Sequence, residues 1–449
     1  MAHSGFAWEN DAQSKTLRGR KSVGSLLLRG RQKLASALTG GINIGTLAAL
    51  LAAVTILCLL IGGIELVYLQ KPYNTYISYP TNDSSLLRPG AYMWGKNFGA
   101  HYFSDFLIPY DWAIQSNPWT DHPLYPAQYP PLPIYLVKLL TGLPYDLAIG
   151  LYLFAMAASA VVAVFLLTRN LDFGTRLTLG VTFGIASTPL MKAFDRGNFI
   201  GFFALLFALF LVGVLRNNKI LAITALTIMV CLKVYPIVLL IVFIKKRWWM
   251  PAVYTVAVSA AVSLLLFAIT PGNIVTTISS FVQANLMAAD IHDSNALVAF
   301  SKSFKSLLHV SPDISWRLAR GLDLAITVAR YATLVAIFVA VAFRKNLHVL
   351  EVAVLGGFAM MVLYGAQIGY NWTWALAEVL AILAATVATH GSRLHLWTLL
   401  KAYPLLGVAV VGVTLLALPT GWHFPGSGRA LTAYIGLVTA IACTIIALF

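Results

Sequence analysis

Long apolar runs recur along this chain, and their length constrains the fold more than any other feature of the sequence. A helix needs about 20 apolar residues to cross the hydrocarbon core of a bilayer. About ten segments approach this length, namely residues 44–68, 146–167, 177–194, 199–215, 251–269, 322–343, 349–368, 374–389, 402–419 and 430–449. Charged residues make up only 10% of the chain, against about 25% in soluble domains. We therefore predict an all-α polytopic membrane protein with a single multi-span domain over residues 44–449.

Basic residues mark one side of this predicted bundle. The formal net charge is +15, and Lys and Arg concentrate in the segment 1–43 and in alternate loops, at Arg169, Arg216, Lys245, Arg344 and Arg393. Cytoplasmic loops of membrane proteins collect Lys and Arg, so the charge indicates a topology among membrane lipids rather than nucleic-acid binding. We expect the basic segment and both termini in the cytoplasm, with the chain in the plasma (inner) membrane.

Two further apolar segments are too short or too interrupted to cross the bilayer. Residues 220–244 have basic residues at both ends and are interrupted at Lys233-Val-Tyr-Pro236. Proline removes a backbone donor and disfavours helix at the residue before it. We predict two short helices that enter the membrane and return, with the break facing an internal cavity. Residues 129–140 are predicted to dip in from the opposite side and lead into the next span.

The first extracytoplasmic loop, residues 70–128, is the longest polar stretch after the first apolar run and is rich in Asp, Tyr, Trp and Pro. A loop of this length in a compact protein is usually functional. It contains Asp105 and, as a second choice, Asp111. A carboxylate at the edge of the bilayer can act as a general base on a hydroxyl, and aromatic rings beside it can stack on a sugar. The alternative is that both aspartates only cap short helices.

Two cations in apolar surroundings are candidates for binding an anion. Arg196 lies in a polar turn between two predicted spans, where its guanidinium can hold a phosphate with two hydrogen bonds. The alternative for Arg196 is a simple ion pair with Asp195. Lys233 interrupts the apolar hairpin, where a charge is costly unless it meets a partner or water. The alternative for Lys233 is an ammonium that reaches a nearby surface; for Lys233 we favour the anion-binding role, because the same segment also breaks its helix.

No motif in the sequence indicates a metal ion or a cofactor. The histidines do not form a spaced ligand set. The phosphate-binding, dinucleotide-binding, zinc-protease and nucleophile-elbow motifs are also absent from the sequence. We predict no bound metal and no cofactor, and leave open whether the activity requires a divalent metal.

A series of short motifs runs in order along the chain. They are Asp105-Phe106 with Tyr110, Pro123-Leu-Tyr125, Tyr129-Pro-Pro-Leu132, Arg196-Gly-Asn198 and Leu232-Lys-Val-Tyr-Pro236. Together they resemble the family 87 glycosyltransferases, which belong to the GT-C superfamily of polytopic membrane enzymes. The resemblance is good over residues 105–249 and elsewhere lies mainly in hydropathy.

This resemblance implies a GT-C-like fold and an inverting glycosyltransferase. Family members include mannosyltransferases and arabinofuranosyltransferases that use polyprenyl-phosphate sugar donors and build the actinobacterial cell envelope outside the cytoplasm. Their acceptors are glycolipids or glycans. The resemblance makes Asp105 the catalytic aspartate, which would act as the general base. The physical reading agrees, because the donor phosphate needs cations and Arg196 and Lys233 are available to bind it. Further substrate contacts are expected from Tyr110, Tyr125, Tyr129, Asn198, Asn295 and Asn371.

One motif departs from the family pattern. Many members carry Ser-Trp-x-His-His before Trp-x-Trp on a late span, whereas this chain has Gly369-Tyr-Asn-Trp-Thr-Trp374, with Asn371 at the histidine position. The difference bears above all on an assignment to the mannosyl branch. A polytopic transporter or lipid flippase is the alternative class, because it would share the spans, the broken helices and the buried charges.

Overall fold

The computed structural model describes residues 42–68, 103–121, 126–286, 328, 331–364, 373–390, 393–394, 396–418 and 431–448. Most of the basic segment 1–43 lies outside the described residues, as do Tyr125, Asn295 and Asn371, for which substrate contacts were predicted.

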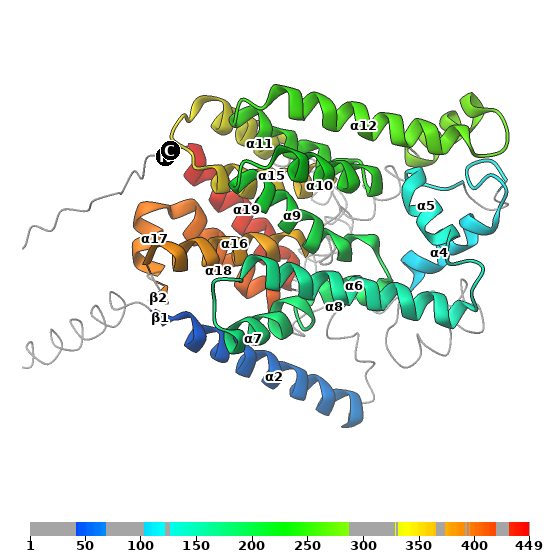
Figure 1. Cartoon of the computed structure of the whole chain (residues 1–449). Coiled ribbons are helices and arrows are strands. Elements are labelled where there is room, and N and C mark those ends of the chain that lie inside the picture. Colours follow the sequence, from blue (N-terminus) through cyan, green and yellow to red (C-terminus); the bar gives the residue numbers. More distant parts are fainter. Residues whose placement is uncertain are drawn as a thin grey trace, which may run out of the picture.

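Helices form nearly all of the described structure, as predicted (Figure 1). The first half contains α2 (Ile44–Tyr68), α4 (Ser104–Ile114), α5 (Pro131–Lys138), α6 (Tyr145–Leu167), α7 (Phe173–Gly184), α8 (Thr188–Arg196), the 3-10 helix η3 (Phe199–Phe202), α9 (Phe203–Leu215) and α10 (Lys219–Leu232). The second half contains η4 (Tyr235–Leu239), α11 (Leu240–Lys245), α12 (Trp249–Ala268), α15 (Val349–Tyr364), α16 (Thr373–His390), α17 (Leu396–Ala402), α18 (Pro404–Ala417) and α19 (Leu431–Leu448). Two more helices span Ile274–Leu286 and Tyr331–Phe343. The short strands β1 (Ile42–Asn43) and β2 (Arg393–Leu394) pair antiparallel.

Helix length confirms only part of the predicted membrane topology. Among the described residues, α6 and α12 are long and apolar enough to cross a bilayer, and they correspond to the spans predicted at 146–167 and 251–269. The bent pair α7–α8 is a third candidate if it forms one span. The other apolar helices fall short of that length over the residues whose side chains are described, so ten full spans are not confirmed.

The span predicted at residues 177–194 is wrong as a single straight helix. α7 ends at Gly184, α8 begins at Thr188, and the two helix axes differ by 52°. Pro189 lies in the first turn of α8, a position that needs no backbone donor. In an unbroken helix the same proline would leave the carbonyl of Ile185 without its partner. The polar α8 therefore starts anew after the bend, in contact with α4, η3 and α18.

The helix break predicted within the hairpin at residues 220–244 is confirmed. α10 gives way to an extended Lys233, and the chain then continues as η4 and α11. The Lys246 ammonium, just after α11, donates to the Val214 carbonyl and to the Asn217 side chain, both at 2.7 Å. Because Val214 lies in the last turn of α9 and Asn217 in the turn that leads into α10, the hairpin starts and ends at the same end of the bundle.

The first residues of α16 lie in the core of the bundle. The Trp374 ring is fully buried, with the rings of Phe207 and Phe358 at 5.7 and 5.8 Å between centroids. Gly357 on α15 makes room for it, because a Cβ at that position would collide with the indole. The Thr373 hydroxyl donates to the Ile200 carbonyl at 2.8 Å, which fixes α16 to η3.

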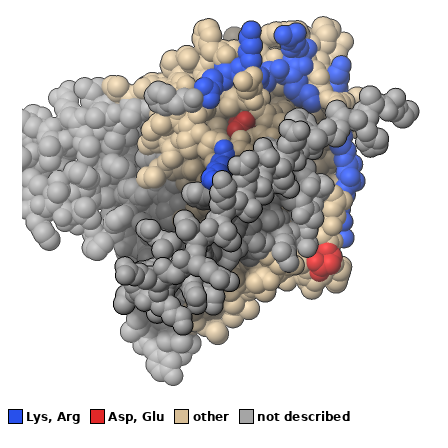
Figure 2. Space-filling view, turned by 90° about the vertical axis from the view of Figure 1, so that its left-hand side faces the viewer, with Lys and Arg blue, Asp and Glu red and all other residues tan. Residues whose placement is uncertain are grey.

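The two ends of the bundle differ in composition. In Figure 1, α4 and α5 lie at the right-hand end, and α11 and α17 lie at the left-hand end. Figure 2 faces that left-hand end and shows Lys and Arg side chains gathered along its upper part, with few acidic side chains among the residues that it colours. Lys246, which ties the two ends of the hairpin, marks the same end. The short helices α4 and α5 therefore lie far from the basic end.

Candidate active site

The turn Arg196-Gly197-Asn198, which the sequence singled out, joins α8 to η3. Gly197 ends α8 with a φ of 65°, in the left-handed region that glycine adopts without strain. Asn198 then caps η3, because its Oδ1 accepts a hydrogen bond from the Ile200 N–H at 3.0 Å. The Gly197 dihedral and the Asn198 cap fix the backbone of this turn. They thereby fix the positions from which the Arg196 and Asn198 side chains extend.

α4 begins directly against this turn. The N–H of Phe103, which precedes α4, donates to the Asp195 carbonyl at 3.2 Å. Phe103 itself has a left-handed φ of 56°, which is uncommon for a bulky residue. The approach depends on Gly197, since a Cβ there would lie 2.8 Å from the Cβ of Phe106. The first turn of α4 is thereby held at the end of α8.

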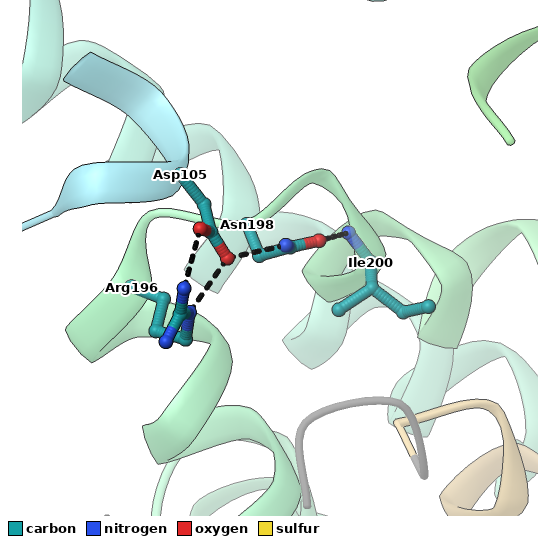
Figure 3. Close-up of polar contacts among 4 residues, drawn as sticks. All are labelled: Asp105, Arg196, Asn198 and Ile200. Atoms are coloured by element: carbon teal, nitrogen blue, oxygen red, sulfur yellow. Dashed lines mark hydrogen bonds and ion pairs between the residues drawn. The ribbon is translucent and has the colours of Figure 1, made fainter. Parts of the chain in front are cut away.

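Asp105, in this first turn of α4, receives three hydrogen bonds from the α8–η3 turn (Figure 3). Arg196 holds it with two parallel bonds, Nε to Oδ2 at 2.7 Å and Nη2 to Oδ1 at 2.8 Å. Asn198 Nδ2 donates to Oδ2 at 2.6 Å. A carboxylate has about four acceptor positions. These bonds fill both positions of Oδ2 and one of Oδ1, which leaves Oδ1 able to accept from a substrate hydroxyl.

The environment of Asp105 determines its protonation. Its side chain is 12% exposed, and burial alone would raise the pKa of the carboxyl. The charges of Arg196 and Lys233 and the hydrogen bonds from Arg196 and Asn198 outweigh burial, so the pKa lies below its ordinary value of 3.8. Asp105 is therefore a carboxylate at neutral pH and can accept a proton.

Lys233 is the second cation of the site. Its side chain is 7% exposed, and its Nζ lies 5.5 Å from the centroid of the Tyr129 ring. It interacts electrostatically with both Asp105 and Arg196. The break in the hairpin thus brings a second cation, besides Arg196, within electrostatic range of the Asp105 carboxylate.

Comparison with known proteins decides the family of this chain. The family model of glycosyltransferase family 87 matches residues 127–365, which is more than half of the chain.

The chain belongs to glycosyltransferase family 87.

The resemblance inferred from the short motifs is thus confirmed, and the protein is a membrane glycosyltransferase. No curated protein and no solved structure matches the chain.

The family 87 match covers only some of the residues that form the site. Arg196, Asn198 and Lys233 lie within residues 127–365, whereas Asp105 precedes them. The link between Asp105 and the matched region is therefore structural, through the three hydrogen bonds that it accepts. Arg196 pairs with Asp105 and not, as the alternative had it, simply with Asp195.

Two further predicted residues of this glycosyltransferase, Tyr110 and Asp111, also lie on α4. The Tyr110 ring is buried against Tyr145, 5.4 Å between centroids, and its hydroxyl donates to the Leu143 carbonyl at 3.4 Å. Asp111 lies half-buried further along α4, and its backbone carbonyl accepts from Gln115. Asp105 accepts three hydrogen bonds from the α8–η3 turn, so Asp105 is the stronger candidate of the two aspartates.

The sequence did not single out Phe103, Thr373 or Tyr152, which also shape the site of this family 87 member. Phe103 docks α4, Thr373 fixes η3, and the Tyr152 ring packs against Phe106 at 4.7 Å between centroids. Each acts through a neighbour distant in sequence, so no local motif reveals it. In the described part of the chain no group of three or more His, Cys, Asp or Glu side chains could hold a metal ion.

Proposed function

We propose that this glycosyltransferase moves mannose or arabinofuranose from a polyprenyl-phosphate donor to a glycolipid or glycan of the cell envelope, with Asp105 as general base. The observation that carries the proposal is the carboxylate of Asp105, held by Arg196 and Asn198 and accompanied by Lys233. A base and two cations in one place are what an inverting transfer from a phosphate requires.

The reaction is a single displacement. An acceptor hydroxyl donates its hydrogen bond to Asp105 Oδ1, and its oxygen attacks the anomeric carbon of the donor. The new carbon–oxygen bond forms as the bond to the phosphate oxygen breaks, and the proton passes to the carboxylate. Polyprenyl phosphate leaves with the electron pair, and the configuration at the anomeric carbon inverts.

The charges at the site fit this sequence of events. Before transfer, Asp105 and a phosphodiester carry two negative charges against the two positive charges of Arg196 and Lys233. After transfer, the protonated Asp105 is neutral and the phosphomonoester carries both negative charges. The cations thus stabilise the charge that develops on the leaving group. The incoming phosphate also offsets their pull on Asp105, so donor binding makes the carboxylate a stronger base.

One guanidinium can serve both partners. Arg196 uses its Nε–Nη2 edge for Asp105, and a guanidinium has five donors in all. Contact with a phosphate therefore does not require Arg196 to release the base. In this role Arg196 sets the distance between the attacking hydroxyl and the leaving group.

The position of the site supports an extracytoplasmic reaction with a lipid-linked donor. α10 starts at the basic end of the bundle and has 14 residues, so Lys233 lies about 21 Å from that end. The hydrocarbon core is about 30 Å thick. With the basic end in the cytoplasm of a plasma-membrane protein, Lys233 lies in the outer part of the membrane, where it can meet a lipid phosphate near the headgroups.

A transporter or lipid flippase remains the alternative to these finer assignments. Both classes would use cations in a broken helix. A carboxylate that is already deprotonated, oriented by three hydrogen bonds and open at Oδ1 favours proton abstraction over transport. Membership of family 87 favours the same reading.

The test is a transfer assay with purified protein in lipid vesicles. Radiolabelled polyprenyl-phosphate mannose and polyprenyl-phosphate arabinofuranose are supplied separately, with an envelope lipid extract as acceptor. We expect Asp105→Asn to lower transfer by about 10²–10⁴-fold and to keep donor binding. Asp172→Asn is the matched control, because Asp172 caps α7 through the Thr175 N–H and asparagine caps equally well.

The outcomes separate the possibilities. Transfer by wild type from one donor names the sugar. Normal turnover by Asp105→Asn would exclude Asp105 as the base. If wild type transfers neither sugar while it moves the lipid-linked donor across the vesicle membrane, the flippase alternative replaces the proposal.

A further inference from the structure

The hydroxyl of Tyr152, on α6, has no hydrogen-bond partner among the described residues, although the side chain is only 5% exposed. Buried hydroxyls normally find a partner, because an unpaired one loses its bonds to water without compensation. Two other tyrosine hydroxyls of the chain follow this rule, since the Tyr110 hydroxyl donates to the Leu143 carbonyl and the Tyr135 hydroxyl bonds to Thr270. The buried hydroxyl of Tyr152 therefore needs an explanation.

The ring of Tyr152 lies between the two elements that build the Asp105 site. On one side it packs against Phe106, the residue after Asp105, at 4.7 Å between centroids. On the other side it packs against Phe199, the residue after Asn198, at 5.4 Å. A phenylalanine would fill this aromatic setting equally well, so the packing does not account for the hydroxyl.

The hydroxyl of Tyr152 is within electrostatic reach of the Asp105 carboxylate. Tyr152 lies seven positions after Tyr145, the first residue of α6, which places it roughly 10 Å along that helix. A phenol at that depth can still bond to a substrate or to a water molecule. One turn further, α6 touches η3 so closely that a Cβ on Gly201 would collide with Met156, so Tyr152 cannot easily move away from the site.

We propose that the Tyr152 hydroxyl is a substrate-binding group, which hydrogen-bonds a hydroxyl of the sugar that reacts at Asp105. This inference rests on the proposed function and extends it. A phenol both donates and accepts a hydrogen bond, as a sugar hydroxyl does, so the two match in chemistry. The sugar can belong to the donor or to the acceptor, and the kinetics of the two substrates distinguish them.

The test compares Tyr152→Phe with wild type in the vesicle transfer assay. We expect kcat/KM to fall by about tenfold or more, as for the loss of one hydrogen bond to substrate. The donor is varied at saturating acceptor, and the acceptor at saturating donor. The substrate whose KM rises is the one that carries the bonded hydroxyl. Tyr135→Phe is the control, because it removes a hydroxyl that bonds only within the protein, to Thr270.

Thermal unfolding of the same variants separates substrate binding from a structural role. Removal of a buried hydroxyl without a protein partner should leave the unfolding temperature of Tyr152→Phe unchanged or higher, whereas Tyr135→Phe should unfold at a lower temperature. Reduced kcat/KM with unchanged or raised stability supports the inference. Lowered stability of Tyr152→Phe, or unchanged kcat/KM for both substrates, overturns it while wild type still transfers sugar. If wild type transfers no sugar, the proposed function fails and this inference fails with it.

Discussion

The guanidinium of Arg196 donates two parallel hydrogen bonds, of 2.7 and 2.8 Å, to the carboxylate of Asp105, which lies 91 positions earlier in the sequence. The pair joins α4, in the loop after the first apolar helix, to the end of α8. One residue therefore serves the base and, in the proposed reaction, the leaving group. Because Arg196 contacts both the base and the proposed leaving group, its replacement is the most informative.

Arg196→Lys should reduce kcat by about 10–100-fold, because lysine keeps the charge but loses one of the two charge-assisted bonds to Asp105. Steady-state transfer rates at saturating donor measure the effect. Arg176→Lys is the matched control, since Arg176 packs over the Phe165 ring, 4.7 Å from its centroid, and has no contact with the cluster. An Arg196→Lys enzyme as fast as wild type would show that the pair of parallel hydrogen bonds from Arg196 to Asp105 is dispensable.

The acid side of the pH profile should report the same ion pair. The pKa of Asp105 is lowered in the folded protein, so the stabilisation from the pair is fully present above the unfolded value near 3.8. It is lost as the pH falls through the lower, folded-state pKa. In Arg196→Gln the pKa of Asp105 should rise, and the acid limb of kcat/KM for the free enzyme should move to higher pH. An acid limb that stays in place would mean that another group titrates.

Gly197→Ala should abolish most activity and lower stability by about 1–3 kcal/mol. The new Cβ would lie 2.8 Å from the Cβ of Phe106 and would require the left-handed φ of 65°. The first turn of α4 would have to move, and Asp105 would move with it. Gly142→Ala offers a control, because a Cβ there meets no atom within 4 Å. Transfer rates and unfolding temperatures of the two variants should therefore diverge; equal values would contradict the role assigned to the α4–turn contact.

Lys233→Met should weaken donor binding by about tenfold or more and should affect binding of the acceptor less. Methionine keeps much of the apolar stem and removes the cation that faces the phosphate. Binding of a non-transferable polyprenyl-phosphate analogue gives the measurement. Lys138→Met is the control, because the Lys138 ammonium also lies over a tyrosine ring, that of Tyr135, at 5.9 Å. Unchanged affinity for the analogue would return Lys233 to a purely structural role.

Much of the fold could be predicted from the sequence because apolar length and proline positions are local signals. The helix at 146–167 and the interruption at Lys233 both follow from such signals. The bend before α8 was missed although Pro189 gives a signal of the same kind, since the apolar run continues through it. Full spans could not be counted from hydropathy alone, because short apolar helices that pack inside the bundle look the same in sequence.

The residues of the site were predicted from the sequence, but the contacts between them were not. Asp105, Arg196 and Lys233 were each proposed for a chemical reason, and the structure places all three together. Nothing in the sequence pairs Asp105 with Arg196, because the contact depends on the left-handed Phe103 and on the absence of a Cβ at Gly197. The orphan hydroxyl of Tyr152 is likewise a property of the packed structure.

The wide separation of Asp105 and Arg196 also orders events during biosynthesis. The carboxylate leaves the ribosome 91 residues before the guanidinium that orients it. At about 5–20 residues per second this is an interval of roughly 5–18 s. In that interval α4 has neither its ion pair nor the turn against which it docks. Catalytic competence therefore arises only after α8 has emerged and folded, so the nascent chain exposes α4 well before it can use a donor.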